Sequence, residues 1–195
     1  MPVSEFFSPE ILIRAYQEGF FPMAESRKGE IYWHSPDPRA IIPLEKVKLP
    51  RSLKQSIKKY NFRFTVNNAF EEVISACADR EETWISDEII ENYLKLHHMG
   101  HAHSVETYID DELAGGLYGV SLGGAFFGES MFNNISDASK AAFYHLVKRL
   151  KLKGFILLDS QYINEHTKML GAIEVPRDFY LKQLTRALTL PVDFD

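Results

Sequence analysis

Residues 115–140 constrain the fold more than any other stretch, because six glycines and four aromatic residues surround one glutamate there, Glu129. The pattern predicts two short strands joined at residues 122–124, then a turn and a helix that begins near Ser136 or Asp137. Glycine at such positions indicates tight turns or a close approach of backbone to a ligand. Two interpretations of Glu129 stay open: an exposed residue of an ordinary hairpin, or a charge at the mouth of an apolar pocket.

Length and composition limit the class of protein. A chain of 195 residues can bury one sizeable core with a small appended lobe. Its 45% hydrophobic and 25% charged residues are typical of soluble globular proteins, and no apolar run reaches the length of a membrane span. Residues 1–14 lack the basic and apolar segments of a secretory signal. The net charge of −5 argues against a protein that coats nucleic acid through its overall field.

The cysteine and histidine residues do not predict a reactive thiol or a metal site. The single cysteine, Cys77, excludes an internal disulfide and is consistent with a reducing cytoplasm. It lies in a helical pattern, where a small buried residue is its expected role. His97 and His101 have helical spacing, but Gly100 should end the helix between them, and no cysteine cluster accompanies them.

The N-terminal part of the chain predicts one helix followed by irregular segments. Residues 8–19 begin with a serine that can cap a helix and end with a glycine that can terminate it. Residues 20–23 are expected to form a loop whose apolar side chains pack or bind a ligand. Residues 32–39 contain two prolines and should form neither a helix nor an inner strand. We expect a connector that places Trp33 and Arg39, either as a domain joint or for ligand contact.

A basic helix is predicted over residues 49–60. Its basic side chains fall at i, i+3, i+7 and i+8 on one face, without an acid among them: Arg51, Lys54, Lys58 and Lys59. Such a face is most often solvated surface, and in an acidic protein a bound phosphate backbone is a second explanation. Trp84 precedes a later helix and belongs either to the core or to a surface that stacks on a base.

The remaining periodicity predicts an α+β fold. The predicted order is helices first, then β-β-β-α-β-α-β-α, which gives a mixed sheet with packed helices. The helices are expected at residues 68–78, 86–99, 136–153, 162–170 and 176–188, and the strands at 103–109, 112–120, 124–130, 155–159 and 172–175. The second half resembles the GNAT-type acyltransferase fold in element order, which specifies no chemistry.

Polar side chains gather where the buried strand of residues 155–159 ends. Asp159 and Gln161 lie at this end, and Asn164 begins the next helix. Such a position suits the binding of developing negative charge. Gln161 and Asn164 could bind an amine or an oxyanion, and Asp159 could orient Gln161 or attract a proton. The alternative is that Asp159 and Gln161 serve only as a helix cap. Residues 128–132 lack the second glycine of a nucleophile elbow, and no P-loop or dinucleotide motif is present.

A series of short motifs along nearly the whole chain resembles the leucyl/phenylalanyl-tRNA–protein transferase family. The motifs are residues 15–23 (AYQEGFFPM), 33–39 (WHSPDPR), 83–85 (TWI), 96–106 (LHHMGHAHSVE), 115–119 (GGLYG), 128–132 (GESMF), 138–140 (ASK), 158–161 (LDSQ) and 170–172 (LGA). The resemblance implies transfer of Leu, Phe or sometimes Met from aminoacyl-tRNA to the N-terminal Arg or Lys of a protein. It also implies a cytoplasmic monomer of the bacterial N-end-rule degradation pathway. The aminoacyl ester is already activated, so no cofactor, metal or covalent intermediate is expected.

The resemblance also implies an organisation and residue roles. Residues 1–37 would form a small N-terminal lobe, and residues 38–195 a GNAT-like catalytic domain. Asp159 and Gln161 would be the catalytic pair, with Asn164 acting at the carbonyl. Glu129 would contact an amino group. The implied substrate-binding residues also include Met131, Phe132, Met23, Trp33 and Trp84, the last at the terminal adenosine, and the implied tRNA-binding residues are Arg51, Lys54, Lys58 and Lys59.

Three departures from the family pattern are visible. The chain begins almost directly at the first helix, and the loss of an N-terminal extension is expected to loosen the lobe. His34 stands where many members carry a second tryptophan, and Gln55 interrupts the basic positions, so tRNA affinity or side-chain preference should differ. Two other classes stay open: a GNAT-type acyl-CoA N-acyltransferase, which needs a glycine that residues 133–137 lack, and a non-catalytic RNA-binding module.

Overall fold

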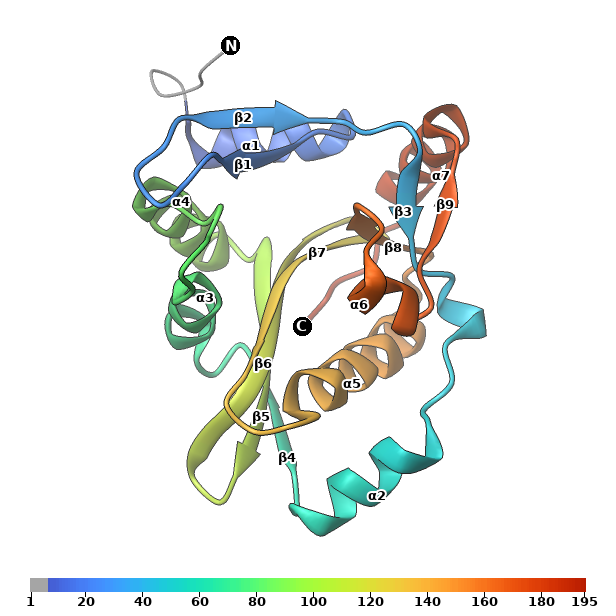
Figure 1. The fold of residues 1–195 in the computed structure, drawn as a ribbon. Helices are drawn as coiled ribbons and strands as arrows, with labels where there is room; N and C mark the ends of the chain where they lie inside the picture. The colour runs from blue at the N-terminus through green and yellow to red at the C-terminus, as the bar shows by residue number, and fades with distance from the viewer. Residues whose placement is uncertain (1–6) are drawn as a thin grey trace.

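A mixed seven-stranded sheet of order β4-β5-β6-β7-β8-β3-β9 forms the centre of the computed structural model, which describes residues 7–195 (Figure 1). A separate two-stranded sheet pairs β1 with β2. Within residues 7–195, β7 and β8 form the one parallel pair. The strands are β1 (Phe21–Ala24), β2 (Ile31–His34), β3 (Arg39–Ile41), β4 (Arg63–Val66), β5 (Ala102–Ile109), β6 (Glu112–Leu122), β7 (Ala125–Asn133), β8 (Leu157–Gln161) and β9 (Ile173–Val175). The predicted α+β fold with a mixed sheet is confirmed.

The predicted helices are present, and their ends follow the capping residues in the sequence. Ser8 and Ser86 each accept a backbone N–H in the first turn of the helix that follows them. Gly100 and Gly154 adopt positive φ at helix ends. The helices are α1 (Pro9–Gln17), α2 (Arg51–Lys59), α3 (Phe70–Ala78), α4 (Asp87–His98), α5 (Ala138–Lys153), α6 (Glu165–Met169) and α7 (Arg177–Leu188), with a short 3-10 turn at Leu44–Lys46.

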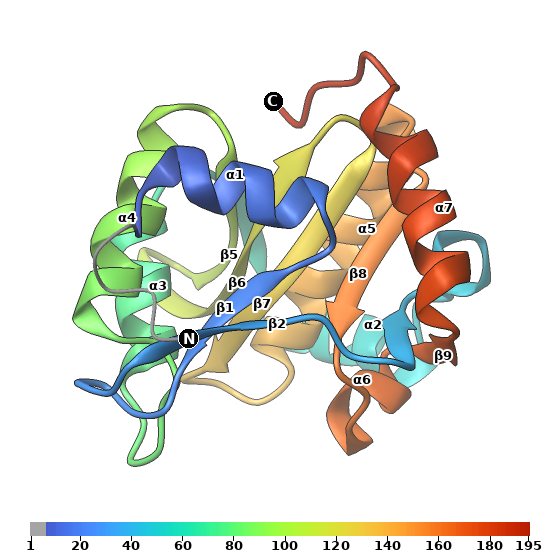
Figure 2. The same ribbon diagram turned by 90° about the horizontal axis from the view of Figure 1, so that it is seen from above.

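The sheet separates two buried layers. Helices α3 and α4 cover one face of β5–β7, and α5 covers the other (Figures 1 and 2). Along β6 the side chains alternate between these layers, so that Leu117 packs on the α5 side and Tyr118 on the side of α3 and α4. The face of α5 that packs on the sheet is buried and consists of Ala138, Ala141, Ala142, Leu146 and Leu150.

The N-terminal third differs from the prediction. Residues 20–23 were expected to form a loop, but Phe21–Ala24 is strand β1 and pairs with β2. Residues 32–39 were expected to contain no inner strand, but Arg39 begins β3, which lies between β8 and β9. Strand β4 was not predicted, so the expected order with helices first is wrong. Strands of three or four residues contain too few alternations for a periodic signal.

The N-terminal elements share a core with the rest of the chain. Leu12, Tyr16 and Phe21 belong to the same buried cluster as Phe127 and Tyr180. Residues 1–6 of the expected lobe lie outside the described residues. No helix within residues 7–195 is both long enough and apolar enough to cross a membrane.

Candidate active site

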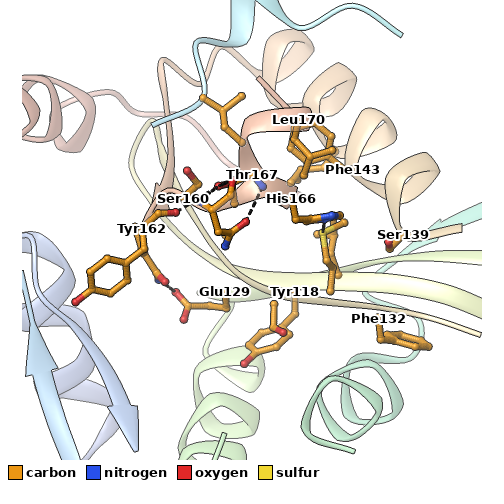
Figure 3. A pocket seen from close by; sticks show the side chains of 18 of the residues that line it. Tyr118, Glu129, Phe132, Ser139, Phe143, Ser160, Tyr162, His166, Thr167 and Leu170 are labelled. Atoms are coloured by element: carbon orange, nitrogen blue, oxygen red, sulfur yellow. Dashed lines mark hydrogen bonds between the residues drawn. The ribbon is translucent and has the colours of Figure 1, made fainter. Parts of the chain in front are cut away.

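A cavity opens where β7 and β8 separate. The two strands pair only over Ala125–Phe127 and Leu157–Asp159, and they diverge beyond this point. The space between them has a volume of about 690 Å³. Residues of both strands line it, together with residues of α5, of α6 and of the segment between α3 and α4 (Figure 3). This volume is in the usual range for small-ligand sites.

One half of the cavity is apolar. Its walls come from β6, β7 and β8, from α5 and from the residue after α6: Leu117, Met131, Phe143, Leu146, Leu158 and Leu170. Met131 was predicted from the sequence, and its sulfur lies 2.9 Å from His166 Nε2. Phe132 also borders the cavity, but it is 7% exposed and packs in the core beneath α3 and α4. The other apolar residues were not predicted as site residues, because nothing in their spacing separates a pocket wall from ordinary core.

Glu129 lies on the polar side of the cavity. It accepts hydrogen bonds at Oε1 from the Tyr16 hydroxyl (2.7 Å) and from Gln161 Nε2 (2.9 Å), and at Oε2 from the Tyr93 hydroxyl (3.4 Å). The two tyrosine hydroxyls also contact each other. Burial raises the pKa of Glu129 to about 7, although these donors favour its charged form. The pocket interpretation of Glu129 is therefore confirmed, and the exposed-hairpin interpretation is wrong.

Asp159 forms a fully buried ion pair with Arg39. The Arg39 guanidinium donates from Nε to Oδ1 (3.0 Å) and from Nη2 to Oδ2 (2.6 Å). The Tyr180 hydroxyl donates to Oδ2 (2.7 Å), and the Gln161 backbone N–H to Oδ1 (2.8 Å). Both members of the pair are 0% exposed. The carboxylate thus has four donors and holds its charge inside the protein.

Arg39 connects Asp159 to the N-terminal elements. Its Nη1 donates to the Gly19 carbonyl (2.9 Å), and its guanidinium lies 4.7 Å from the ring centre of Phe21 and 4.5 Å from that of Tyr180. The sequence indicated that the proline-rich connector places Arg39 but not what it contacts. No local pattern in the sequence connects Arg39 to Asp159, because 120 positions separate the two residues.

Gln161 ends β8 with an unusual backbone conformation. Its φ of 66° lies in the left-handed region, which costs a residue other than glycine about 1 to 3 kcal/mol. The bond from its N–H to Asp159 helps to hold this conformation, and its side chain turns to Glu129 instead. Asp159 therefore contacts the backbone of Gln161 and not its amide group.

Asn164 caps α6. Its Oδ1 accepts from the Thr167 N–H (2.8 Å), and Thr167 Oγ1 accepts from the Asn164 N–H (2.9 Å). The cap of α6 is therefore Asn164, and not the Asp159–Gln161 pair that the helix-cap alternative named. Asn164 also lines the cavity, and its Nδ2 makes no hydrogen bond to the described part of the chain.

The other predicted site residues lie in different places. Trp84 and Met23 are partly buried and line the cavity. Trp33 does not line it and packs against the core, with its ring centre 5.9 Å from that of Phe7. The basic residues of α2 are exposed and lie outside the cavity, on a helix beside the start of α5 (Figure 1): Arg51, Lys54, Lys58 and Lys59.

Three buried hydroxyl groups that line the cavity have no hydrogen-bond partner within residues 7–195. They belong to Tyr118, Ser139 and Ser160 (Figure 3). Buried polar groups are usually paired, so these three hydroxyls are exceptions among the described residues. The Cys77 thiol is buried, and burial raises its pKa to about 12, as expected for a structural cysteine. No group of three or more potential metal ligands occurs in the described residues.

Two family models match the chain in sequence. Residues 41–185 match the leucyl/phenylalanyl-tRNA protein transferase model, and residues 7–37 match the model of its N-terminal domain. The chain belongs to the leucyl/phenylalanyl-tRNA protein transferase family. The predicted resemblance is therefore confirmed, and the chain is an aminoacyltransferase. The acyl-CoA acyltransferase and the non-catalytic RNA-binding module are set aside.

Curated relatives cover the chain almost completely. A leucyl/phenylalanyl-tRNA--protein transferase of Gloeobacter violaceus is 54% identical over 187 residues, which is 96% of this chain and 97% of the relative. One of Chlorobaculum tepidum is 53% identical over 189 residues, or 95% of this chain and 97% of the relative.

A solved structure supports the fold. It contains a GCN5-related glucosamine N-acetyltransferase region in a fungal multi-domain GH3 β-N-acetylglucosaminidase. It aligns with a TM-score of 0.51 at 9% identity, covering 86% of this chain and 22% of that one. The predicted GNAT-like sheet is confirmed, and this similarity carries no inference about activity.

Proposed function

We propose that this transferase moves Leu, Phe or Met from aminoacyl-tRNA to the N-terminal Arg or Lys of acceptor proteins, forming a peptide bond. The observation that carries the proposal is the cavity, in which an apolar wall large enough for one such side chain meets the Glu129–Gln161 pair. The apolar wall suits Leu, Phe or Met, and the carboxylate suits an amino group. The reaction would serve N-end-rule degradation in the cytoplasm, where aminoacyl-tRNA is available. We also propose that the transferase acts as a monomer.

The proposed chemistry needs positioning more than activation. The acceptor α-amine attacks the ester carbonyl, the ester C–O bond breaks, and the amine proton passes to the departing ribose oxygen of the tRNA. Holding both amino acids in the cavity makes this step effectively intramolecular. The residues would have to orient the amine and stabilise the oxyanion that forms at the carbonyl.

The roles that we propose use side-chain atoms of the site that are still available for hydrogen bonds. Gln161 donates through Nε2 to Glu129, so its Oε1 is available to accept from the amine N–H. Asn164 can donate through Nδ2 to the oxyanion. Glu129 contacts the amino group, and a pKa of about 7 allows it to exchange a proton with an α-amine of pKa about 8. Asp159 acts through the backbone of Gln161 as a positioning residue. Trp84 offers a ring to the terminal adenosine.

The activity test uses labelled leucyl-tRNA with two peptides that differ only in beginning with Arg or Ala. Label on the Arg peptide alone supports the proposal. Label on both peptides, or on neither while the leucyl-tRNA stays intact, contradicts it. Gln161→Ala should lower turnover without weakening tRNA binding, and the exposed Gln17→Ala on α1 is the matched control.

The basic face of α2 is proposed to bind the phosphate backbone of the tRNA acceptor stem. Lys58→Ala combined with Lys59→Ala should weaken tRNA binding and reduce the slope of log affinity against log salt by up to about 0.9 for each phosphate that is no longer neutralised. Lys182→Ala combined with Arg186→Ala, on the exposed face of α7, is the control with the same charge change. An equal salt slope in the two double variants would make α2 ordinary surface.

A further inference from the structure

Two basic side chains from separate segments contact Met131 at the edge of the cavity, and a third, Lys140 of α5, lies near them. Arg80, which follows α3, donates from Nη2 to the Met131 carbonyl. His166 of α6 contacts the Met131 sulfur. Burial lowers the pKa of His166, and the nearby charges of Lys140 and Arg80 lower it further. We name Arg80, Lys140 and His166 the basic rim. The proposed chemistry at Glu129 and Gln161 does not use it.

The beginning of α5 lies beside the basic rim. Ser139, in the first turn of this 16-residue helix, is 0% exposed, lines the cavity and carries one of the unpartnered hydroxyls (Figure 3). The side chain of the N-cap residue Asp137 accepts no backbone N–H of the first turn, so these N–H groups are not capped by its carboxylate. A neutral acceptor, Asn133 Oδ1, takes the Ser139 N–H (2.7 Å).

The acids near the basic rim only partly offset its charge. Asp137 accepts from Lys140 Nζ at 3.3 Å and from the Ser56 hydroxyl of α2 at 2.8 Å. Asp79 is exposed and also borders the cavity. The Arg80 guanidinium lines the cavity and is outside every ion pair of the described residues, so its charge is available to a bound anion.

The basic rim lies between two features already assigned to the tRNA. The bond between Ser56 and Asp137 joins the basic helix α2 to the start of α5, and Trp84 lines the same cavity as Arg80. A strand that leaves a duplex on α2 and enters the cavity toward Trp84 therefore passes the rim. Single-stranded nucleic acid is typically held by such a combination of positive groove and aromatic ring.

We propose that the basic rim, with the Ser139 hydroxyl, binds the phosphodiester groups of the single-stranded 3′ end of the aminoacyl-tRNA. The proposal rests on the proposed function, because it needs an aminoacyl-tRNA in the cavity. Arginine and lysine match phosphate oxygens in charge and donor geometry, and the serine hydroxyl gains the acceptor that it lacks. The bound backbone fixes how deeply the terminal adenosine enters.

The test compares two leucylated probes that cannot transfer because an amide replaces the ester. One probe is adenosine, and the other is the trinucleotide CCA, which adds two phosphodiester groups. Wild type should bind the trinucleotide more tightly. Arg80→Ala and Lys140→Ala should each weaken trinucleotide binding about tenfold, reduce its salt slope by about 0.7 and leave adenosine binding unchanged. Lys182→Ala is the control for removal of a distant charge.

Two results would overturn the proposal. Wild-type trinucleotide affinity in both rim variants would mean that the rim touches no phosphate. An equal loss of affinity for both probes would mean that the substitutions deform the pocket rather than remove a phosphate interaction. A wrong proposed function would give a different result. The wild-type protein would then bind neither probe, and it would transfer no leucine from leucyl-tRNA in the activity test.

Discussion

The buried pair of Arg39 and Asp159 makes a quantitative prediction about Asp159→Asn. The substitution removes one of two charges that are both 0% exposed, so the Arg39 charge stays buried without its counter-ion. Its remaining polar partners are the Gly19 carbonyl and the Tyr180 hydroxyl. Breaking a buried ion pair in this way costs about 3 to 5 kcal/mol. A typical domain has only about 5 to 15 kcal/mol of stability in total.

Thermal and urea unfolding followed by circular dichroism would measure this loss of stability. For a chain of this size, each kcal/mol lowers Tm by about 2 to 4 °C, so we expect a fall of about 6 to 20 °C. Asp111→Asn is the matched control, because Asp111 pairs with Arg63 at 3.3 Å but both side chains are exposed. This control should unfold like wild type, since solvent screens the pair.

A double variant separates charge burial from other effects. Arg39→Met combined with Asp159→Asn leaves no unpaired buried charge, so it should be more stable than Asp159→Asn alone. An unchanged Tm in Asp159→Asn would refute the reasoning, because it would mean that Asp159 is already uncharged or that the pair contributes nothing. The predicted stability loss also means that turnover of this variant must be compared per folded molecule.

Three further predictions concern single side chains. The pKa of Glu129 is raised above its ordinary 4.5 to about 7, so ionisation of this carboxyl destabilises the folded state. In urea unfolding at increasing pH, Glu129→Gln should therefore gain stability relative to wild type between these two pH values. If the unfolding free energies of the two proteins change in parallel with pH, the prediction is wrong. Ser86→Ala removes the cap bond to the Ile89 N–H and should cost about 1 kcal/mol in the same assay, whereas no loss of stability would mean that water replaces the cap. The buried Cys77 thiol should react with a thiol reagent only after unfolding, and rapid labelling of native protein would show that it is accessible.

The sequence predicted the parts of the fold that carry long or repeated signals. The meander from β5 to β7 and helices α4, α5 and α7 have several periods each, with serine, glycine or proline at their ends. Strands β1 to β4 span three or four residues each and were misjudged or missed. Pairing with strands that are distant in sequence holds these segments in place, and a local pattern contains no trace of such partners.

Prediction from sequence meets the same limit for single residues of the candidate site. The structure brings Glu129, Gln161 and Asn164 to one cavity, but the sequence did not predict the contacts that each of them makes. Arg39 lies 120 positions from Asp159 in sequence, so no spacing rule connects the two. Strand alternation would put Asp159 and Gln161 on one face, yet the positive φ of Gln161 turns its side chain toward Glu129 instead. The two tyrosine donors to Glu129 come from α1 and α4, which only the tertiary fold brings together.

Arg39 has a consequence for how the molecule opens. It falls between the two segments that match the family models, residues 7–37 and 41–185, and its guanidinium bonds to Gly19 in the first and to Asp159 in the second. A fluctuation that lifts α1 and the β1–β2 ribbon from the sheet must break the bond from Arg39 to the Gly19 carbonyl, whereas the Arg39–Asp159 pair stays between the neighbouring strands β3 and β8. The same fluctuation takes the Tyr16 hydroxyl of α1 away from Glu129. Local opening of the N-terminal segment therefore disturbs the candidate site before the central sheet comes apart.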